Sequence, residues 1–337
     1  MHPLAAEILA YIRSEPGDEE TFSSLALELF AYQFEHNEAY RLLCESLGSG
    51  PSTVKNWQDI PPAPARAFKR CSLSCVPADR VLREFHSSGT TGPETSRHLM
   101  DADALALYEE SLSTGFEAAM PSDRPREIWA MMQNPKAAPH SSLGHMLSTL
   151  GASRFYWDDN RTLAEELRRR EAPLTLFGTA FAFVDLFDSG KDNGHLPAGS
   201  VVVETGGFKG RTREVPREQL YEMISSRLGV PLDRCYSEYG MSEMASQFYS
   251  RGLDPVKRGP HWVRSFVIDP ATGSRIDRFD SAGILAHLDL ANFNSVCALQ
   301  TEDMALMNQG GFILSGRAED SELRGCSLTV EELWTRE

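Results

Sequence analysis

The chain has 337 residues, and its 33 basic against 48 acidic side chains give a net charge of −15. Hydrophobic residues make up 41% and charged residues 24%, which is ordinary for a globular protein that can bury a full core. The acidic balance argues against nucleic acid as the main partner, because a phosphate backbone is bound by a basic stripe. A small anionic ligand is not excluded, since it needs only a local site.

The cysteine usage and the apolar segments bear on the cellular compartment of the protein. Six cysteines are scattered along it, and Cys71 and Cys75 have no second pair that would complete a zinc site. This usage predicts free thiols in a reducing compartment. The N-terminus lacks the basic start of a signal peptide, and the longest nearly apolar run, 174–184, is too short for a membrane span. We therefore expect a cytoplasmic protein with no membrane span.

The first part of the chain is expected to be helical. Apolar residues recur at roughly helical spacing in residues 3–14 and 21–46, and a Gly/Pro/Ser stretch at 48–53 follows them. Residues 60–66 (IPPAPAR) are expected to be extended, because each proline disfavours helix in the residue before it. The pattern predicts an N-terminal helical segment, residues 1–60, packed on the rest of the chain.

From about Val81 onward, short apolar runs alternate with helical segments. This alternation predicts βαβ units and a mostly parallel sheet in an α/β core, residues 61–258. The runs WVRSFVID, GILAHLDL and GGFILSG predict a smaller antiparallel β-rich subdomain, residues 259–316, before a C-terminal tail, residues 317–337. The expected strands are 81–86, 126–132, 153–157, 173–177, 199–204 and 233–237. The expected helices are 101–119, 141–150, 161–170, 178–188 and 215–228.

The strongest local signal is the segment HSSGTTGP, residues 86–93, which directly follows an expected strand. Its glycines permit unusual backbone angles and the close approach of a ligand. Its hydroxyls, and the amides between them, can form a concave anion site. It is not a Walker A loop, because no lysine follows. The segment predicts a phosphate-binding loop, although a solvated polar turn has the same composition.

The second signal is YSEYGMSE, residues 236–243, which again follows an expected strand. Its glycine turn presents an aromatic ring, a hydroxyl and a carboxylate together. Mg²⁺ takes few protein oxygens and several from phosphate, so a carboxylate beside a phosphate loop is a natural magnesium ligand. Taken alone, the segment would also fit an exposed acidic turn.

A third signal is ETGGFKG, residues 204–210, after the strand SVVV. At the carboxyl end of a parallel strand this segment would face the ligand crevice of an α/β sheet. Its Gly-Gly pair would let a flat base lie against the backbone. A plain strand-to-helix turn is the alternative.

A fourth signal combines TED, residues 301–303, with Gly316-Arg317. An aspartate can accept hydrogen bonds from both hydroxyls of a ribose, and an arginine can hold a ribose or a phosphate with two bonds. Each of these residues, considered singly, would also fit an ordinary surface position.

Taken together and in this order, the four motifs resemble those of a known protein superfamily. SSGTTG, the Gly-Gly turn, YGMSE, TED and SGR resemble the motifs of the adenylate-forming superfamily of acyl-CoA synthetases and their relatives. More narrowly, LELFAYQFEHNEAY, IPPAPARAFKR, SSGTTGPETSRH, ETGGFKGR, YGMSE and GRAEDSELRGCSL resemble LuxE-like acyl-protein synthetases over nearly the whole chain. The resemblance implies the N-terminal-type α/β fold of that superfamily, with a parallel βαβ core, a smaller antiparallel β subdomain and no C-terminal lid domain.

The resemblance also implies a reaction. A carboxylic acid, expected to be a fatty acid, would be activated by ATP and Mg²⁺ as acyl-AMP and then transferred to a thiol, which is the work of an acid–thiol ligase. The phosphates of ATP would be held by Ser87, Ser88, Gly89, Thr90, Thr91, Gly92 and Ser242. The adenosine would contact Gly206, Gly207, Tyr239, Gly240 and Asp303. Glu243 would bind the metal, and Glu243 and Arg317, which lies beside Asp303, would act in catalysis.

Two departures from the superfamily pattern matter. The phosphate loop usually ends in Pro-Lys, but here Pro93 is followed by Glu94, and Arg97 could supply the missing cation. The catalytic lysine of the usual lid domain is expected to be absent. The candidates to replace it are Lys69, Lys209, Arg211 and a partner protein.

The resemblance makes Cys326 the acyl-accepting nucleophile, on a tail that would visit the adenylate and then a partner protein. A thiolate displaces AMP readily from a mixed anhydride. A buried structural role is the alternative for Cys326 and the expectation for the other five cysteines. An acyl pocket would involve Trp129, Gln133, Asn134 or Phe177, although Phe177 is expected to be core.

Two rival functions stay open. One is a ligase that delivers its acyl or aryl group directly to CoA or to the phosphopantetheine arm of a carrier protein. The other is a non-catalytic partner subunit that binds a nucleotide. Release of pyrophosphate with a matching acid would separate the two classes.

Overall fold

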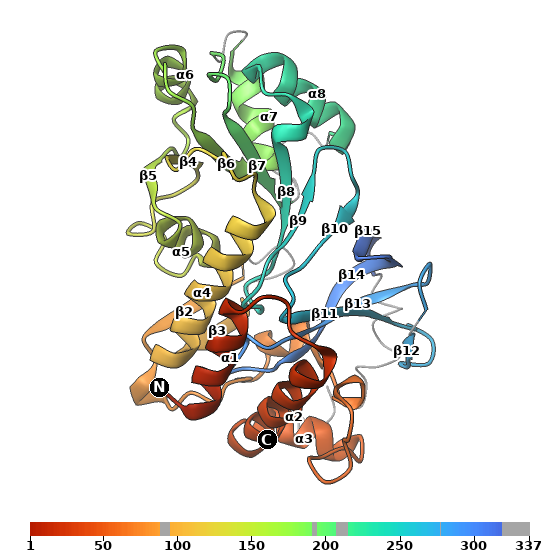
Figure 1. Cartoon of the computed structure of the whole chain (residues 1–337). Coiled ribbons are helices and arrows are strands. Elements are labelled where there is room, and N and C mark those ends of the chain that lie inside the picture. The colour runs from red at the N-terminus through yellow and green to blue at the C-terminus, as the bar shows by residue number, and fades with distance from the viewer. Residues whose placement is uncertain (88–94, 191–193, 207–214, 277, 319–337) are drawn as a thin grey trace. The chain divides into compact units, whose positions relative to one another are not determined.

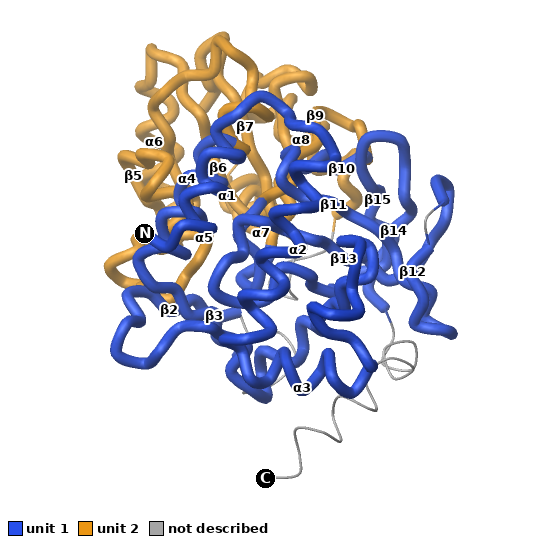
Figure 2. The backbone as a smooth tube through the Cα atoms, turned by 60° about the horizontal axis from the view of Figure 1, so that its bottom comes forward, with its two compact units in different colours: residues 1–114, 241–246, 256–337 blue, residues 115–240, 247–255 orange. Residues whose placement is uncertain are grey.

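A computed structural model of the chain describes residues 1–87, 95–190, 194–206, 215–276 and 278–318. The contacts divide it into two compact units (Figure 2). Unit 1 comprises residues 1–114, residues 241–246 and the chain from residue 256 onward, and unit 2 comprises residues 115–240 and 247–255. In the described part of the chain, no helix is both long and apolar enough to cross a membrane.

Unit 1 begins with three helices, α1 (Pro3–Arg13), α2 (Glu19–His36) and α3 (Glu38–Ser46) (Figure 1). The prediction of one helix over 21–46 is therefore wrong. Asn37 separates α2 from α3 because its backbone is extended and its side chain accepts a hydrogen bond from the amide of Tyr40, which caps α3. The same side chain donates to the carbonyl of Ser295 at 3.1 Å, so a distant part of the chain fixes the break.

The sheet of unit 1 has the strand order β10-β15-β14-β13-β11-β12, and β1 pairs with β14. Its strands are β1 (Ala63–Pro64), β10 (Val256–Lys257), β11 (Val263–Ile268), β12 (Arg275–Ile276), β13 (Ala282–Asp289), β14 (Ala298–Asn308) and β15 (Gly311–Arg317). The pairings are antiparallel except that of β1, which confirms the β structure predicted after residue 258. At Gly311 a Cβ atom would lie 2.1 Å from the carbonyl oxygen of Lys257, so β10 and β15 pair closely only because this residue is glycine.

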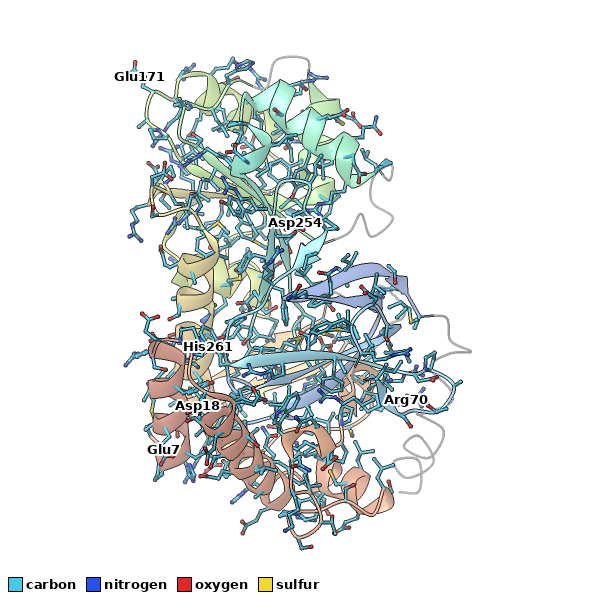
Figure 3. All side chains as sticks on the ribbon, turned by 45° about the vertical axis from the view of Figure 1, so that its right-hand side comes forward. Glu7, Asp18, Arg70, Glu171, Asp254 and His261 are labelled. Atoms are coloured by element: carbon cyan, nitrogen blue, oxygen red, sulfur yellow. The ribbon has the colours of Figure 1, made fainter. Side chains whose placement is uncertain are left out.

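The N-terminal helices pack against this sheet within the same unit. The side chain of Gln33 donates to the carbonyls of Asn292 and Phe293 at 2.8 Å and accepts from the amide of Cys297 at 2.7 Å. His261, labelled in Figure 3, bonds the carbonyl of Tyr11 on α1 at 2.9 Å. The boundaries expected after residues 60, 258 and 316 do not coincide with the two units, because such long-range contacts join the two ends of the chain.

A separate two-stranded antiparallel sheet, also in unit 1, consists of β2 (Arg83–His86) and β3 (Arg97–Met100). The strand expected at 81–86 is present, but it pairs with β3 and not with the parallel series. The helix α4 (Ala102–Ala119) follows, and its last residues belong to unit 2. The short 3₁₀ helices of the chain are η1 (Trp57–Asp59), η2 (Ala65–Lys69), η3 (Ala78–Arg80) and η4 (Leu232–Arg234).

Unit 2 contains a six-stranded sheet in the order β5-β4-β6-β7-β8-β9. The first five strands are parallel and β9 is antiparallel to β8, which confirms the predicted βαβ core. The strands are β4 (Ile128–Met131), β5 (Ala152–Phe155), β6 (Thr175–Thr179), β7 (Val201–Thr205), β8 (Cys235–Tyr239) and β9 (Phe248–Arg251). The helices are α5 (Ser142–Thr149), α6 (Asn160–Arg168), α7 (Ala180–Ser189) and α8 (Arg217–Leu228). Apolar side chains of β6, β7 and β8 form one buried core with those of α6, α7 and α8.

Candidate active site

The hydroxyl-rich loop predicted to bind phosphate starts and ends at two bonded serines of unit 1. The amide of Ser87 donates to the carbonyl of Ser96 at 3.2 Å, and the amide of Ser96 donates to the hydroxyl of Ser87 at 3.1 Å. These bonds extend the β2–β3 ladder by one pair and close the base of the loop. The predicted binding residues Ser88, Gly89, Thr90, Thr91 and Gly92 lie outside the described residues.

The cation expected near this loop is engaged by a carboxylate. Nε of Arg97 donates to Oε1 of Glu84, and Nε2 of His86 lies 2.8 Å from the same oxygen. The bond from Arg97 is the largest of the effects that lower the pKa of Glu84 to about 2. Arg97 can act on a phosphate only with its remaining guanidinium donors, or after leaving Glu84.

The segment 241–246 belongs to unit 1 and brings two predicted residues to the base of the loop. The hydroxyl of Ser242 donates to the carbonyl of His86 at 3.3 Å. The hydroxyl of Ser96 donates to Oε1 of Glu243, whose side chain is almost fully buried. Burial is the main effect that raises the pKa of this carboxyl group. Within unit 1, the structure therefore places Ser242 and Glu243 directly beside the loop's base.

Two buried side chains fix the backbone of this segment. Nδ1 of His98 lies 2.7 Å from the carbonyl oxygen of Ser242, which can only accept, so this nitrogen carries the proton. Burial lowers the pKa of His98 to about 4, and the ring is neutral at pH 7. Nδ2 of Asn292 donates to the carbonyl of Glu243 at 2.9 Å and to that of Val296 at 2.8 Å.

Asp289, at the end of β13, holds the residues that follow Glu243. Its Oδ2 accepts from the amide of Ala245 at 3.1 Å, and its Oδ1 accepts from the hydroxyl of Ser246 at 2.8 Å and from the amide of Ala291 at 3.0 Å. Asp289 is 1% exposed, and burial raises its pKa to about 6. The carboxylate thus replaces water as the partner of several buried donors.

The sequence motifs assign no role to the four supporting residues, which are Ser96, His98, Asp289 and Asn292. Two signals point to them. Ser96 and His98 alternate along the strand that leaves the loop, so they share one face of it. Asp289 and Asn292 are polar residues in the largely apolar stretch HLDLANFNSVCAL, where a buried polar group needs a specific partner.

The predicted ribose-binding pair is also formed within unit 1. Asp303 on β14 and Arg317 on β15 are direct partners in the strand register. Nε of Arg317 lies 3.6 Å from Oδ1 of Asp303, and the side chains are 64% and 22% exposed respectively. The pair therefore combines an accessible carboxylate with an accessible guanidinium.

The remaining predicted adenosine contacts belong to unit 2, where they follow two neighbouring parallel strands. Thr205 at the end of β7 and Glu238 near the end of β8 are register partners, and the hydroxyl of Thr205 donates to the Glu238 carboxylate. Gly206 follows with φ of 69°, a left-handed conformation that favours glycine. Tyr239 ends β8 and Gly240 follows it, so these residues share the carboxyl edge of the sheet with Gly206. Gly207 lies outside the described residues.

The residues of the candidate site would hold a magnesium ion only if phosphate oxygens of a bound ligand supplied further ligands to it. Among the residues that the structure describes, no group of three or more His, Cys, Asp or Glu side chains could hold a metal ion. Glu243 offers one carboxylate beside the loop's base, and Mg²⁺ usually takes one or two carboxylates together with phosphate oxygens and water. Lys69, one candidate to replace the lid lysine, lowers the pKa of Glu243 through its charge, against the larger effect of burial. Lys209 and Arg211 lie outside the described residues.

The five cysteines in the described ranges are free thiols with low reactivity. Burial raises the pKa of Cys71 to about 11 and raises that of Cys297 further. The pKa is about 12 for Cys44, Cys75 and Cys235. Since the thiolate is the nucleophile, none of these five is prepared to attack an acyl group at pH 7. Cys326 lies outside the described residues.

Two of the side chains considered for an acyl pocket are buried. Trp129 is 2% exposed, and the guanidinium groups of Arg154 and Arg170 lie 5.0 and 5.4 Å from its ring. Phe177 is fully buried, as expected of a core residue. Gln133 and Asn134 are exposed just after β4.

Comparisons with known proteins agree with the motifs. No protein-family model matches the chain. It is 22% identical over 338 residues to the long-chain-fatty-acid–luciferin-component ligase of Vibrio harveyi. This match covers 93% of this chain and 88% of that protein.

Two solved structures have the same fold. An open conformation of 2-hydroxyisobutyryl-CoA ligase in complex with 2-HIB-AMP and CoA matches with a TM-score of 0.68 at 15% identity, over 91% of this chain and 77% of that one. ATP-bound MatB from Rhodopseudomonas palustris matches with a TM-score of 0.53 at 14% identity, over 72% of this chain and 49% of that one. The resemblance to LuxE-like ligases and the adenylate-forming fold are thereby confirmed.

Proposed function

We propose that this chain is an ATP-dependent acyl-adenylating ligase that resembles LuxE, and that it passes the activated acyl group to a thiol. The observation that carries the proposal is the arrangement at the base of the loop in unit 1. There Ser87, Ser242 and the buried carboxylate of Glu243 are joined through hydrogen bonds to one hairpin. The similarity to the luciferin-component ligase, which spans 93% of the chain, indicates the same class of activity.

In the first step, a carboxylate oxygen of the acid would attack the α-phosphorus of ATP. The acyl–phosphate bond forms, the bond between the α-phosphorus and the bridging oxygen breaks, and pyrophosphate leaves with the electron pair. Because the phosphates are already negative, the site must supply cations and donors that offset this charge and align the attack. The loop that starts at Ser87 and the hydroxyl of Ser242 would hold the phosphates. When bound at Glu243, a magnesium ion would neutralise part of their charge.

The proposed nucleoside contacts are Asp303 and Arg317 in unit 1 and Gly206, Tyr239 and Gly240 in unit 2. The carboxylate of Asp303 can accept from both ribose hydroxyls, and the guanidinium of Arg317 can donate to the ribose or the α-phosphate. The backbone at Gly206 and Gly240, with the ring of Tyr239, would bound the adenine.

In the second step, a thiolate would attack the acyl carbon, and AMP would leave with the electron pair of the broken bond. We propose Cys326 as this thiol, as the resemblance to LuxE-like acyl-protein synthetases implies. Burial raises the pKa values of the five described cysteines, so they are poor alternatives. Five free thiols also support a reducing compartment, and we propose the cytoplasm. A second candidate acceptor is CoA, since the 2-hydroxyisobutyryl-CoA ligase structure of the same fold contains CoA together with an acyl adenylate.

The testing experiment is an intact-mass spectrum of the chain after incubation with ATP, Mg²⁺ and a panel of fatty and aryl acids. Pyrophosphate release is measured in parallel. A gain of one acyl group, removed by hydroxylamine and mapped to Cys326, is the expected result. Acid-dependent pyrophosphate release without an adduct would move the acceptor to CoA or a carrier protein. If neither signal appears with any acid, even with candidate partner proteins added, a non-catalytic nucleotide-binding subunit becomes the better account.

A further inference from the structure

Ser96 lies where two of the proposed binding elements meet. Its amide and carbonyl both bond Ser87, the first residue of the loop. Its hydroxyl donates to Oε1 of Glu243, the proposed metal ligand. Ser96 is 1% exposed, so water does not compete for these bonds. None of the roles assigned from the sequence falls on this residue.

The backbone that carries Glu243 is fixed without help from Ser96. His98 bonds the carbonyl of Ser242 at 2.7 Å, Asn292 bonds the carbonyl of Glu243 at 2.9 Å, and Asp289 bonds the amide of Ala245 at 3.1 Å. Among the described residues, the hydroxyl of Ser96 donates to the carboxylate of Glu243 and not to the backbone of this segment. Its removal would therefore free the side chain of Glu243 and leave the main chain of the segment in place.

We infer that Ser96 is a positioning residue for Glu243, an inference that rests on the proposed function. The hydroxyl holds Oε1 and fixes the plane of the carboxylate, so that Oε2 is the oxygen available to a cation carried by the ATP phosphates. The bonds from the amide and carbonyl of Ser96 to the hydroxyl and amide of Ser87 set where that oxygen lies relative to the start of the loop. Ordering a glutamate side chain costs rotamer entropy. Because Ser96 orders Glu243 before the ligand binds, this cost does not weaken the binding of the ligand.

Mn²⁺ in the presence of ATP, with no acid added, is the probe that tests the inference. The electron paramagnetic resonance signal is compared with that of a protein-free Mn²⁺–ATP blank, because ATP alone also binds the ion. Ser96→Ala is compared with the parent, with Ser96→Thr, which keeps the hydroxyl, and with the control Ser295→Ala. Ser295 is fully buried, and its hydroxyl donates to the carbonyl of Leu73 at 2.9 Å, away from Glu243. Partners behind a metal ligand typically change affinity about 10- to 100-fold.

We expect Ser96→Ala to weaken Mn²⁺ binding about tenfold, and Ser295→Ala and Ser96→Thr to retain the parent affinity. In a Glu243→Ala background, Ser96→Ala should have no further effect on Mn²⁺ affinity. In turnover, the KM for Mg²⁺ should rise while the rate at saturating Mg²⁺ is largely retained. If Ser96→Ala does not fold, the near-isosteric Ser96→Cys, whose thiol is a weak donor, should show an intermediate loss.

Equal Mn²⁺ affinity in Ser96→Ala and Ser295→Ala would overturn the inference and leave the proposed function standing. If Mn²⁺ binding depends on Ser96 but the parent releases no pyrophosphate with any acid, the proposed function fails and the positioning of Glu243 stands. No Mn²⁺ binding by the parent with ATP present would overturn both.

Discussion

The buried carboxylate of Asp289 makes the stability of unit 1 depend on pH in an unusual direction. Asp289 accepts from Ala245, Ser246 and Ala291, and these hydrogen bonds lower its pKa by less than burial raises it. Desolvation dominates and raises its pKa from 3.8 to about 6. The protonated form is therefore favoured in the folded chain relative to the unfolded one.

The size of the effect follows from the shift. A difference of about two pKa units between the folded and unfolded states corresponds to about 3 kcal/mol. Since the pKa is raised on folding, this stabilisation is fully present below the unfolded value of 3.8 and is lost as the pH rises through about 6. Roughly 2 kcal/mol of it should disappear between about pH 4.5 and about pH 7.

Urea unfolding of the parent and of Asp289→Asn over this pH range measures the effect. The variant cannot ionise here, so the free energy of unfolding of the parent should fall relative to that of the variant as the pH rises. Groups with lowered pKa values, such as Glu84, act in the opposite direction, but both proteins carry them and they cancel in the difference. Lost hydrogen bonds in the variant add a constant offset. Two parallel curves would refute the reasoning, because they would mean that Asp289 titrates alike in the folded and unfolded chains.

Three further predictions concern the proposed site. Glu243→Gln keeps the shape of the side chain and removes its charge, so acid-dependent pyrophosphate release should fall about a hundredfold or more, with the circular dichroism spectrum unchanged; retained release would remove Glu243 from catalysis. Asn292→Ala leaves the carbonyls of Glu243 and Val296 without their amide donor and should lower the free energy of unfolding by about 2–4 kcal/mol. Chemical denaturation measures this loss, and a decrease of less than about 1 kcal/mol would contradict the prediction. Cys326→Ser should keep adenylation and lose the stable acyl-enzyme in an intact-mass spectrum, and equal labelling of parent and variant would rule out Cys326 as the acceptor.

The core of unit 2 could be predicted from sequence because its strands are buried on both faces. The strands expected at 173–177, 199–204 and 233–237 match β6, β7 and β8, each of which begins two residues later. Continuous apolar runs between turn residues are typical of such parallel strands. The parallel order follows from the helices between them, since a crossover helix returns the chain to the same edge of the sheet.

The division into units was less predictable, because it depends on contacts between distant residues. The expected boundaries treat neighbours in sequence as neighbours in space. Gln33 instead bonds the segment 292–297, and Asn37 bonds Ser295. The same bond from Asn37 accompanies the break between α2 and α3, for which the local sequence offers neither proline nor glycine. Asn37 caps α3 through a local bond to Tyr40, but its second bond, to a residue more than 250 positions away, has no signal in the local sequence.

The residues of the candidate site also differ in how far the local sequence could predict them. Motif residues such as Ser87 and Glu243 were assigned because their types and order fit a phosphate and a metal. The residues that hold them in place, such as Ser96, were not assigned, because Ser96 and Glu243 are 147 residues apart and no local sequence pattern connects them. Yet a carboxylate as buried as Glu243 has to be anchored by a donor to act in one orientation. A motif therefore implies partners whose places in the chain only the fold determines, and polar residues within apolar stretches, as Asp289 and Asn292 are, are where such partners should be sought first.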